Sequence, residues 1–226
     1  MSTYVDQIIY DGADFFTNPE PRCPVLLLLD CSGSMSGNPI AELNSGLQNL
    51  KRDLDEDPFA RKRVEVSVMT FGGSVTLVND FTTVDSWQPP KLVTTGDTPL
   101  GKAVRDGLLL LRKRKDAIRS HGIELLRPWV FLITDGEPTD SWKDLPALLA
   151  SEAEARAFLF YCVGVQGANL DLLRELSPSN PPLRLVGLKF HELFKWLSSS
   201  LSKVGQSKPG DKIKLDPTTG WGEIEV

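Results

Sequence analysis

The chain has 226 residues, of which 41% are hydrophobic and 24% are charged, as in an ordinary globular protein of one large domain or two small ones. Its formal net charge of −5 argues against general nucleic-acid binding, and no apolar run approaches the roughly 20 residues that span a bilayer. Three scattered cysteines, Cys23, Cys31 and Cys162, are too few for a disulfide framework. With an N-terminus that lacks a signal-peptide pattern, these features predict a cytoplasmic protein that binds neither membrane nor nucleic acid.

The central part of the chain alternates segments with strand-like and helix-like apolar spacing. In chain order, the first half predicts a strand at 25–30, a helix at 38–54, strands at 64–71 and 74–78, and a helix from 99 to about 111. The second half predicts a strand at 129–134, helix at 141–157, strand at 158–165, helix at 169–176, strand at 183–186 and helix at 190–201. Proline at the start of the first helix and a Gly-Gly pair between the second and third strands support these boundaries.

Strands that are apolar throughout, such as residues 25–29, are typical of a parallel sheet buried on both faces. The alternation therefore predicts an α/β fold: a doubly wound, mainly parallel six-stranded sheet with one antiparallel edge strand and helices on both faces. One domain over residues 23–204 accounts for the pattern, after an N-terminal arm over 1–22. The C-terminal tail, 205–226, is predicted to form either a docked hairpin, pairing 212–215 with 223–226, or a loosely docked arm.

Three segments place oxygen-bearing side chains at the ends of predicted strands or at a helix start. Asp30, Ser32 and Ser34 follow the first strand, Thr98 precedes a helix, and Asp135 ends the strand at 129–134. Taken alone, these are ordinary features: an Asx turn, a helix cap and a simple turn. Because open α/β sheets bind ligands beyond the carboxyl ends of their strands, the three segments together predict a site for a hard cation such as Mg²⁺.

The same five residues resemble the metal-ion-dependent adhesion site of the von Willebrand factor A domain. That family has an Asp-x-Ser-x-Ser loop after the first strand, a Thr in a second loop and an Asp that ends the fourth strand. Asp30, Ser32, Ser34, Thr98 and Asp135 fill every position. The phrases Leu-Leu-Leu-Asp-Cys-Ser-Gly-Ser-Met and Leu-Ile-Thr-Asp-Gly-Glu-Pro-Thr-Asp are most similar to the bacterial tellurite-resistance TerY-like branch.

This resemblance implies that Ser32, Ser34 and Thr98 bind the metal directly, whereas Asp30 and Asp135 bind it directly or through water. The metal is expected to be Mg²⁺, with Mn²⁺ or Ca²⁺ as alternatives, and an Asp or Glu of a partner protein completes its coordination. The expected role is a cytoplasmic, non-enzymatic interaction module in stress-response, tellurite-resistance or defence signalling. Expected partners are a protein kinase, a protein phosphatase or an AAA+ ATPase, and the chain itself is expected to be monomeric.

A metal-dependent hydrolase or phosphotransferase that uses the same cation is the alternative function. Against it, the site offers neither a His or Lys as a general base nor a nucleophilic Asp-x-Asp. A redox sensor based on Cys31 has little support, because a small buried side chain is the more ordinary role for this residue.

Three further acidic residues lie near the predicted site, and a basic run follows in the next predicted helix. Asp97, Glu137 and Asp140 crowd the same rim, where a solvated loop and a cap for the next helix are the simplest roles. An alternative role for Asp97 is to tune metal affinity, which an Asp97→Asn protein with unchanged metal and partner affinity would contradict. The basic run at 112–115 predicts a solvated helix end, with a docking patch for an acidic partner as the alternative.

Overall fold

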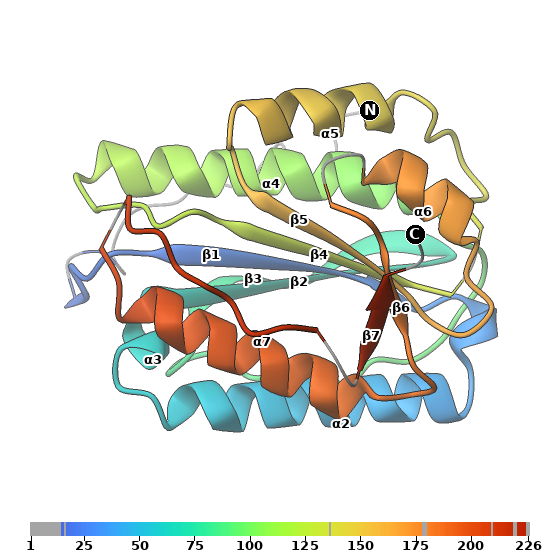
Figure 1. Ribbon diagram of the computed structural model, residues 1–226, viewed down its shortest axis with the longest axis horizontal. Coiled ribbons are helices and arrows are strands. Elements are labelled where there is room, and N and C mark those ends of the chain that lie inside the picture. Colours follow the sequence, from blue (N-terminus) through green and yellow to red (C-terminus); the bar gives the residue numbers. More distant parts are fainter. Residues whose placement is uncertain are drawn as a thin grey trace.

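A computed structural model describes residue 15 and residues 17–135, 137–177, 180–208, 210–218 and 221–224. Its centre is a seven-stranded sheet in the order β3-β2-β1-β4-β5-β6-β7 (Figure 1). The strands are β1 (Cys23–Asp30), β2 (Val64–Gly72), β3 (Ser74–Thr83), β4 (Trp129–Thr134), β5 (Leu159–Gly164), β6 (Leu183–Leu185) and β7 (Gly222–Ile224). Five of them are parallel, whereas β3 and β7 run antiparallel to their neighbours.

Helices cover both faces of this sheet. After the short 3-10 helix η2 (Gly33–Met35) they are α2 (Asn38–Asp55), α3 (Ala60–Arg63), α4 (Leu100–Ser120), α5 (Leu145–Glu154), α6 (Leu170–Leu176) and α7 (Phe190–Gly205). The helices α2, α3 and α7 lie on one face and α4, α5 and α6 on the other (Figure 1). No helix within the described ranges has the length and apolar character needed to span a bilayer.

The central strand β1 shows why its sequence is apolar without interruption. Val25, Leu27 and Leu29 pack into the core on the α2 and α7 side, while Leu26 and Leu28 pack into the core on the α4 side. Since both faces of the strand are buried, every side chain before Asp30 must tolerate removal from water.

The predicted fold class is confirmed: the sheet is doubly wound and mainly parallel, with helices on both faces. The six predicted strands become β1 to β6, and Gly73, at φ 64°, makes the turn into antiparallel β3. The tail adds the short strand β7, which pairs with β6, so residues 222–224 reach the sheet itself. The helix predicted over 141–157 is shorter and begins at Leu145, one residue before a proline suited to a first turn.

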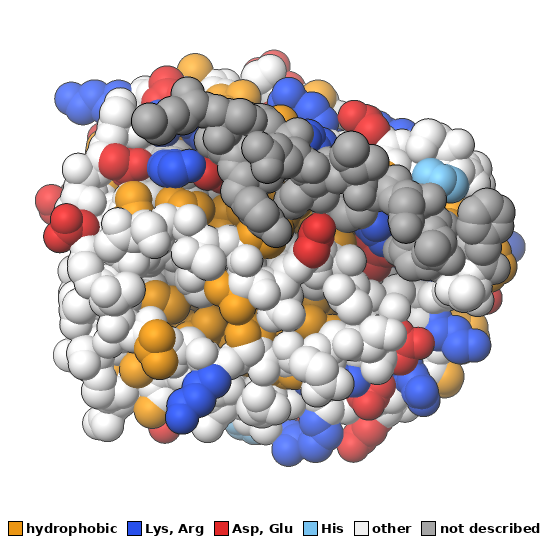
Figure 2. Space-filling model, turned by 180° about the vertical axis from the view of Figure 1, so that it is seen from behind, with side chains coloured by type: hydrophobic (Ala, Val, Ile, Leu, Met, Phe, Trp, Pro, Cys, Tyr) orange, Lys and Arg blue, Asp and Glu red, His pale blue; other side chains and the backbone are white. Residues whose placement is uncertain are grey.

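The strand β3 forms one edge of the sheet. Figure 2 shows the molecule from the opposite side to Figure 1, and on this face hydrophobic side chains gather between charged ones. Val78 on this strand is 39% exposed. The pairing of β2 with β3 shifts register between Val66 and Met69. Such irregularities bend an edge strand, which is a common way to discourage pairing with another chain.

Arg22, Glu65 and Arg114 form a buried group of three charges, which we call the ion triad. Glu65 Oε1 lies 2.9 Å from Arg22 Nε and 2.7 Å from Arg114 Nη2, and Arg114 Nε donates to Glu65 Oε2 at 2.9 Å. The ring of Phe15 covers Arg114, with 4.7 Å between the guanidinium carbon and the ring centroid. The solvated helix end predicted for 112–115 is therefore wrong for Arg114, which is 2% exposed. The triad ties the end of the N-terminal arm to the domain.

Asp57 joins the start of α3 to the end of α7. Its carboxylate accepts hydrogen bonds from the backbone N–H groups of Phe59 (2.9 Å) and Ala60 (3.0 Å) and from Gln206 Nε2 (3.1 Å). Burial by itself raises the pKa of Asp57, but these bonds, with one from Ser202, outweigh it and hold the pKa below its ordinary value. The charged form of Asp57 therefore stabilises the folded state.

We expect Asp57→Asn to lower the free energy of unfolding by about 1 kcal/mol at neutral pH. Because the folded-state pKa is lowered, the charge contributes fully above the unfolded-state pKa of about 4, and its contribution is lost as the pH falls through the lower folded-state value. The difference between wild type and variant should therefore shrink in acid. Urea unfolding across this pH range measures it, with Glu56→Gln as the exposed neighbouring control. A difference that does not change with pH would contradict this role.

Candidate metal centre

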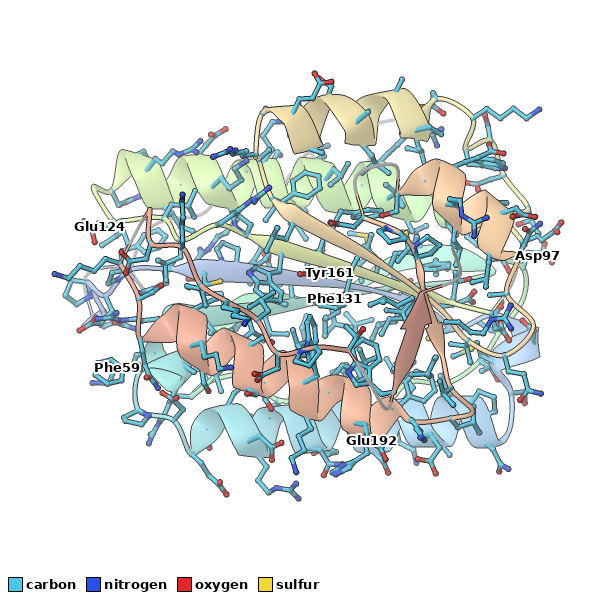
Figure 3. All side chains as sticks on the ribbon, viewed as in Figure 1. Phe59, Asp97, Glu124, Phe131, Tyr161 and Glu192 are labelled. Carbon is cyan, nitrogen blue, oxygen red and sulfur yellow. The ribbon has the colours of Figure 1, made fainter. Side chains whose placement is uncertain are left out.

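The predicted site residues lie at the carboxyl end of the sheet, where β1 and β4 end side by side. These strands are parallel neighbours, and Thr134 Oγ1 at the end of β4 donates a hydrogen bond to Asp30 Oδ2 at the end of β1. This pairing places Asp135, the next residue, beside the loop that follows β1. Figure 3 shows Asp97 at this end of the molecule and Glu124 at the opposite end.

Hydrogen bonds connect the side chains of the loop after β1 to Asp135. Asp30 is fully buried, and its Oδ1 accepts a hydrogen bond from Ser32 N at 2.8 Å. The hydroxyls of Ser32 and Ser34 are 3.0 Å apart, and Ser34 Oγ donates to Asp135 Oδ1 at 2.7 Å. Ser32 is buried, Ser34 is exposed and Asp135 is partly exposed. Four of the five predicted residues are therefore connected by hydrogen bonds, from buried Asp30 through the backbone and side chain of Ser32 to Ser34 and Asp135 near solvent.

The loop that carries Thr98 is bound to the loop after β1. Gly33 N donates to Gly96 O at 3.1 Å, and Thr95 N donates to Cys31 O at 2.7 Å. Thr98 itself is 6% exposed and is held through its backbone by Thr139: Thr98 N donates to Thr139 Oγ1 at 3.1 Å, and Thr139 N donates to Thr98 O at 2.9 Å. The structure thus brings all three predicted loops together.

Sequence reasoning missed Thr134 and Thr139, the residues that orient Asp30 and Thr98. Thr134 is the last residue of β4, and its polar side chain is fully buried. A hydroxyl at the end of an otherwise apolar strand is the signal that could have identified it, because a buried hydroxyl needs a hydrogen-bond partner. Thr139 had no comparable signal, since its partner lies on another loop.

The charge on Asp30 disfavours ionisation of Asp135. Burial raises the pKa of Asp135 and the charge on Asp30 raises it further, while the hydrogen bond from Ser34 opposes both effects. A bound cation would relieve this repulsion. The described residues contain no cluster of three or more His, Cys, Asp or Glu side chains that could hold a metal ion, so a metal here depends on hydroxyl ligands. The two carboxylates and three hydroxyls of the predicted residues would form an all-oxygen donor set, a chemistry that fits a hard divalent cation.

The neighbouring acidic residues have structural partners. Glu137 Oε1 accepts a hydrogen bond from Asn169 Nδ2 at 2.8 Å. Asp140 accepts from Gly101 N at 2.8 Å and from Lys102 N at 2.7 Å, so it caps α4, the preceding helix, and not the next helix as predicted. The segment from Gly96 to Lys102 has the Gly-x-x-x-x-Gly-Lys spacing of a phosphate loop, but this carboxylate already takes two of the amides that would face a phosphate.

Cys31 has the environment of a structural thiol. Its side chain is 3% exposed, and burial, helped by the charge on Asp30, raises the pKa of the thiol to about 12. Because the thiolate is the reactive form, Cys31 is poorly suited to redox chemistry. This agrees with the role of a small buried side chain.

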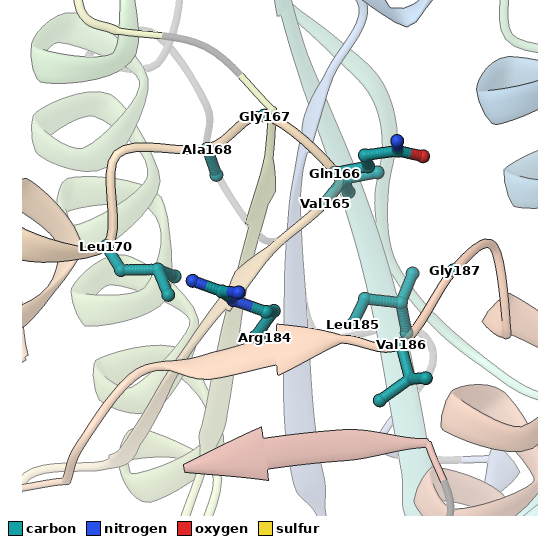
Figure 4. Close-up of a pocket in the computed structure, with 9 residues that line it drawn as sticks. All are labelled: Val165, Gln166, Gly167, Ala168, Leu170, Arg184, Leu185, Val186 and Gly187. Carbon is teal, nitrogen blue, oxygen red and sulfur yellow. The ribbon is translucent and has the colours of Figure 1, made fainter. Parts of the chain in front are cut away.

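A cavity of about 480 Å³ lies next to the candidate metal centre, between the loop after β5 and strand β6 (Figure 4). Leu170, Arg184 and Leu185 are among its lining residues, together with Gly167. A side chain added at Gly167 would come 3.9 Å from the carbonyl oxygen of Asp135, so one wall of the cavity lies near the backbone of Asp135. The rim therefore has both a group of oxygen donors and an adjacent hollow.

A family model of the von Willebrand factor type A domain matches residues 25–186. The chain belongs to this family. The matched span contains all five predicted site residues and every parallel strand. A comparison of this von Willebrand factor type A domain with curated protein sequences found no match.

Solved structures share the fold at low sequence identity. The pilus adhesin SpaC from Lactobacillus rhamnosus GG, in an open conformation, is 15% identical, with a TM-score of 0.59 over 82% of this chain and 31% of its own. Proximal thread matrix protein 1 from the mussel byssus, with a zinc-occupied MIDAS motif, is 18% identical, with a TM-score of 0.50 over 83% of this chain and 46% of its own. Manganese-loaded TRAP protein of Plasmodium vivax is 21% identical, with a TM-score of 0.50 over 71% of this chain and 64% of its own. The chain thus spans less than two thirds of each of these proteins.

Proposed function

We propose that this domain is a metal-dependent protein-interaction module. Asp30, Ser32, Ser34, Thr98 and Asp135 hold a divalent cation, with Mg²⁺ preferred and Mn²⁺ or Ca²⁺ as alternatives. When bound, the cation supplies an electrophilic position that accepts an Asp or Glu side chain of a partner protein. The observation that carries this proposal is the hydrogen-bonded group of Asp30, Ser32, Ser34 and Asp135, which extends from buried Asp30 to solvent-exposed Ser34.

Two features support a cation in this position. The charge on Asp30 raises the pKa of Asp135, and the remaining donors are neutral hydroxyls, so a divalent cation balances the charge. Two structurally similar proteins are described with manganese or with zinc in a MIDAS motif. The cavity beside Gly167 would give a partner side chain room near the backbone of Asp135.

The setting is proposed from the sequence resemblance to the TerY-like branch. We propose a cytoplasmic, monomeric module of a stress-response, tellurite-resistance or defence signalling system. Its partners would be a protein kinase, a protein phosphatase or an AAA+ ATPase, each of which would present an acidic residue to the metal.

A non-enzymatic role is favoured over a hydrolase or phosphotransferase that uses the same cation. Neither histidine is placed to act as a general base there: His121 follows the C-terminal end of α4, and His191 lies on α7 beside Asn49. The α4 amides that would bind a phosphate are occupied by Asp140. A site that only binds needs neither group.

Calorimetric titration of Mg²⁺ and Mn²⁺ into the chelator-stripped chain tests the metal site. Wild type should bind saturably, and Asp30→Ala should not. Because Asp30 is buried, Ser34→Ala is the safer variant, and it should weaken binding by roughly tenfold or more. Ser36→Ala is its matched control, since Ser36 is an exposed serine two residues further along and outside the donor set. Equal metal affinity in Ser34→Ala and Ser36→Ala would contradict the proposed donor set.

A pull-down in Mg²⁺ or in chelator, followed by a screen for phosphate release, tests the use of the metal. Metal-dependent capture of a protein by wild type, lost in Ser34→Ala and without turnover, is the expected result. Phosphate release that needs the same residues would establish the enzymatic alternative instead.

A further inference from the structure

The end of the molecule opposite the metal centre carries six cations for which the described residues show no ion pair. Arg127 lies just before β4 and Arg156 just before β5, so both stand at the amino ends of adjacent parallel strands. The remaining four are in α4 and the tail: Lys115, Arg119, Lys208 and Lys212. In a chain with a net charge of −5, such a group needs an explanation.

Within the described parts of the chain, none of these six side chains forms an ion pair. Lys115 Nζ donates instead to Ala157 O at 3.2 Å, and Arg127 Nη2 donates to Phe158 O at 3.0 Å. Burial lowers the pKa of Arg127 and so does the nearby charge of Arg156. Arg127 and Arg156 therefore repel each other, as do Lys115 and Arg119, although Glu152 and Asp116 partly offset the repulsion at Lys115.

A cavity of about 510 Å³ opens among these cations, bounded by β5, the end of α7 and the tail. Its charged lining includes Arg127, Arg156, Lys208 and Lys212. The single carboxylate of the described lining, Asp211, accepts a hydrogen bond from the backbone of Lys208 at 2.8 Å. An adjoining cavity of about 450 Å³ shares Arg127 and Arg156 and adds the two α4 cations.

One wall of the larger cavity is apolar. Leu159 and Tyr161 of β5 and Ile213 of the tail line it. The Tyr161 ring stacks on Phe131, with 4.9 Å between centroids and 13° between planes, so it forms a fixed floor (Figure 3). Strand β6 pairs with β5 only at Val163 and Gly164, which leaves the first half of β5 next to the tail.

The tail segment 210–218 runs along this side of the molecule (Figure 1) and is fastened to α7. Trp196 Nε1 donates to Asp216 O at 2.8 Å, and Lys203 Nζ lies 2.6 Å from Asp216 Oδ1. The cavity is thus a defined space with one cationic rim and one apolar wall.

We infer that this cavity binds a small organic anion with an apolar body. A carboxylate or phosphate group would lie between Arg127 and Arg156, whose guanidinium groups match the paired oxygens of such anions. The apolar part would pack on Leu159, Tyr161 and Ile213. A volume of about 510 Å³ lies within the roughly 300–1,000 Å³ typical of ligand pockets. Nucleic acid is disfavoured because the Tyr161 ring is already stacked on Phe131 and leaves no open platform for successive bases.

Titration of the full chain with the fluorescent anion anilinonaphthalene sulfonate tests this inference. Wild type should bind one dye saturably. Arg127→Gln keeps a donor for Phe158 O, and Arg156→Asn suits the backbone there, since Arg156 has φ 51°. Each variant should bind the dye about tenfold more weakly. Arg52→Gln, the same change on exposed α2, should leave binding unchanged.

Competition on the wild-type chain is a second arm that needs no variant. Octanoate should displace the dye, whereas octanol, which lacks the charge, and inorganic phosphate, which lacks the apolar body, should not. Displacement by octanol as readily as by octanoate would show an apolar cavity without anion recognition and overturn the inference. Unchanged dye binding by the Arg127→Gln/Arg156→Asn double variant would overturn it as well. Ser34→Ala should bind the dye as wild type does, which separates this site from the metal centre.

Discussion

Glu65→Gln should lower the free energy of unfolding by about 3–5 kcal/mol, because it removes the charged carboxylate with which buried Arg22 and Arg114 pair. Both arginines are within hydrogen-bonding distance of the Glu65 carboxylate, and none of the three side chains is more than 2% exposed. The substitution keeps the size of the side chain, so the loss reflects charge and not a cavity. Urea unfolding monitored by fluorescence measures the change.

Glu152→Gln is the matched control for this experiment. Glu152 pairs with Arg112 at 3.1 Å on the surface, where the arginine side chain is 61% exposed. Exposed pairs contribute at most about 1 kcal/mol, because water and salt screen them. If Glu65→Gln cost no more than Glu152→Gln, the ion triad would have to be solvated. Joint replacement of the triad by Met and Leu should recover most of the loss, since an apolar group then fills the same space.

Gly72→Ala should cost about 3 kcal/mol of stability and abolish metal binding, because it forces apart two of the three loops of the centre. A methyl group at Gly72 would lie 2.3 Å from Cys31 O and 2.8 Å from Thr95 O. Both contacts are with backbone, so no side chain can rotate away. Urea unfolding and Mg²⁺ calorimetry on the same preparation measure the two effects.

Gly33→Ala makes the same chemical change in the neighbouring loop and serves as its control. A methyl group there would meet only Gly96 O, at an ordinary 3.8 Å. We expect near-wild-type stability and metal affinity from this variant. Metal binding retained by Gly72→Ala would mean that the loops adjust independently, and the link between β2 and the centre would have to be abandoned.

The candidate metal centre shows which parts of a site can be predicted from the sequence. Asp30, Ser32 and Ser34 are local in sequence, and their position after an apolar strand indicated a rim site. The contribution of Thr139 could not be predicted from the sequence, because it acts through a hydrogen bond to Thr98, 41 residues away. The role of Asp140 was assigned to the wrong helix for the same reason: a cap was recognised, but its partner is 39 residues earlier.

The sequence by itself determined the layers of this protein, since apolar runs and helical spacings are encoded within a few neighbouring residues. Only the tertiary structure decided which distant polar groups meet. In the sequence, Glu65 is one charge in a predicted strand and Arg114 is one cation in a basic run. The fold buries them together although they are 49 residues apart. The pairing of β7 with β6 has the same origin. The partner of a buried charge depends on chain topology, and a pattern of neighbouring residues does not contain that information.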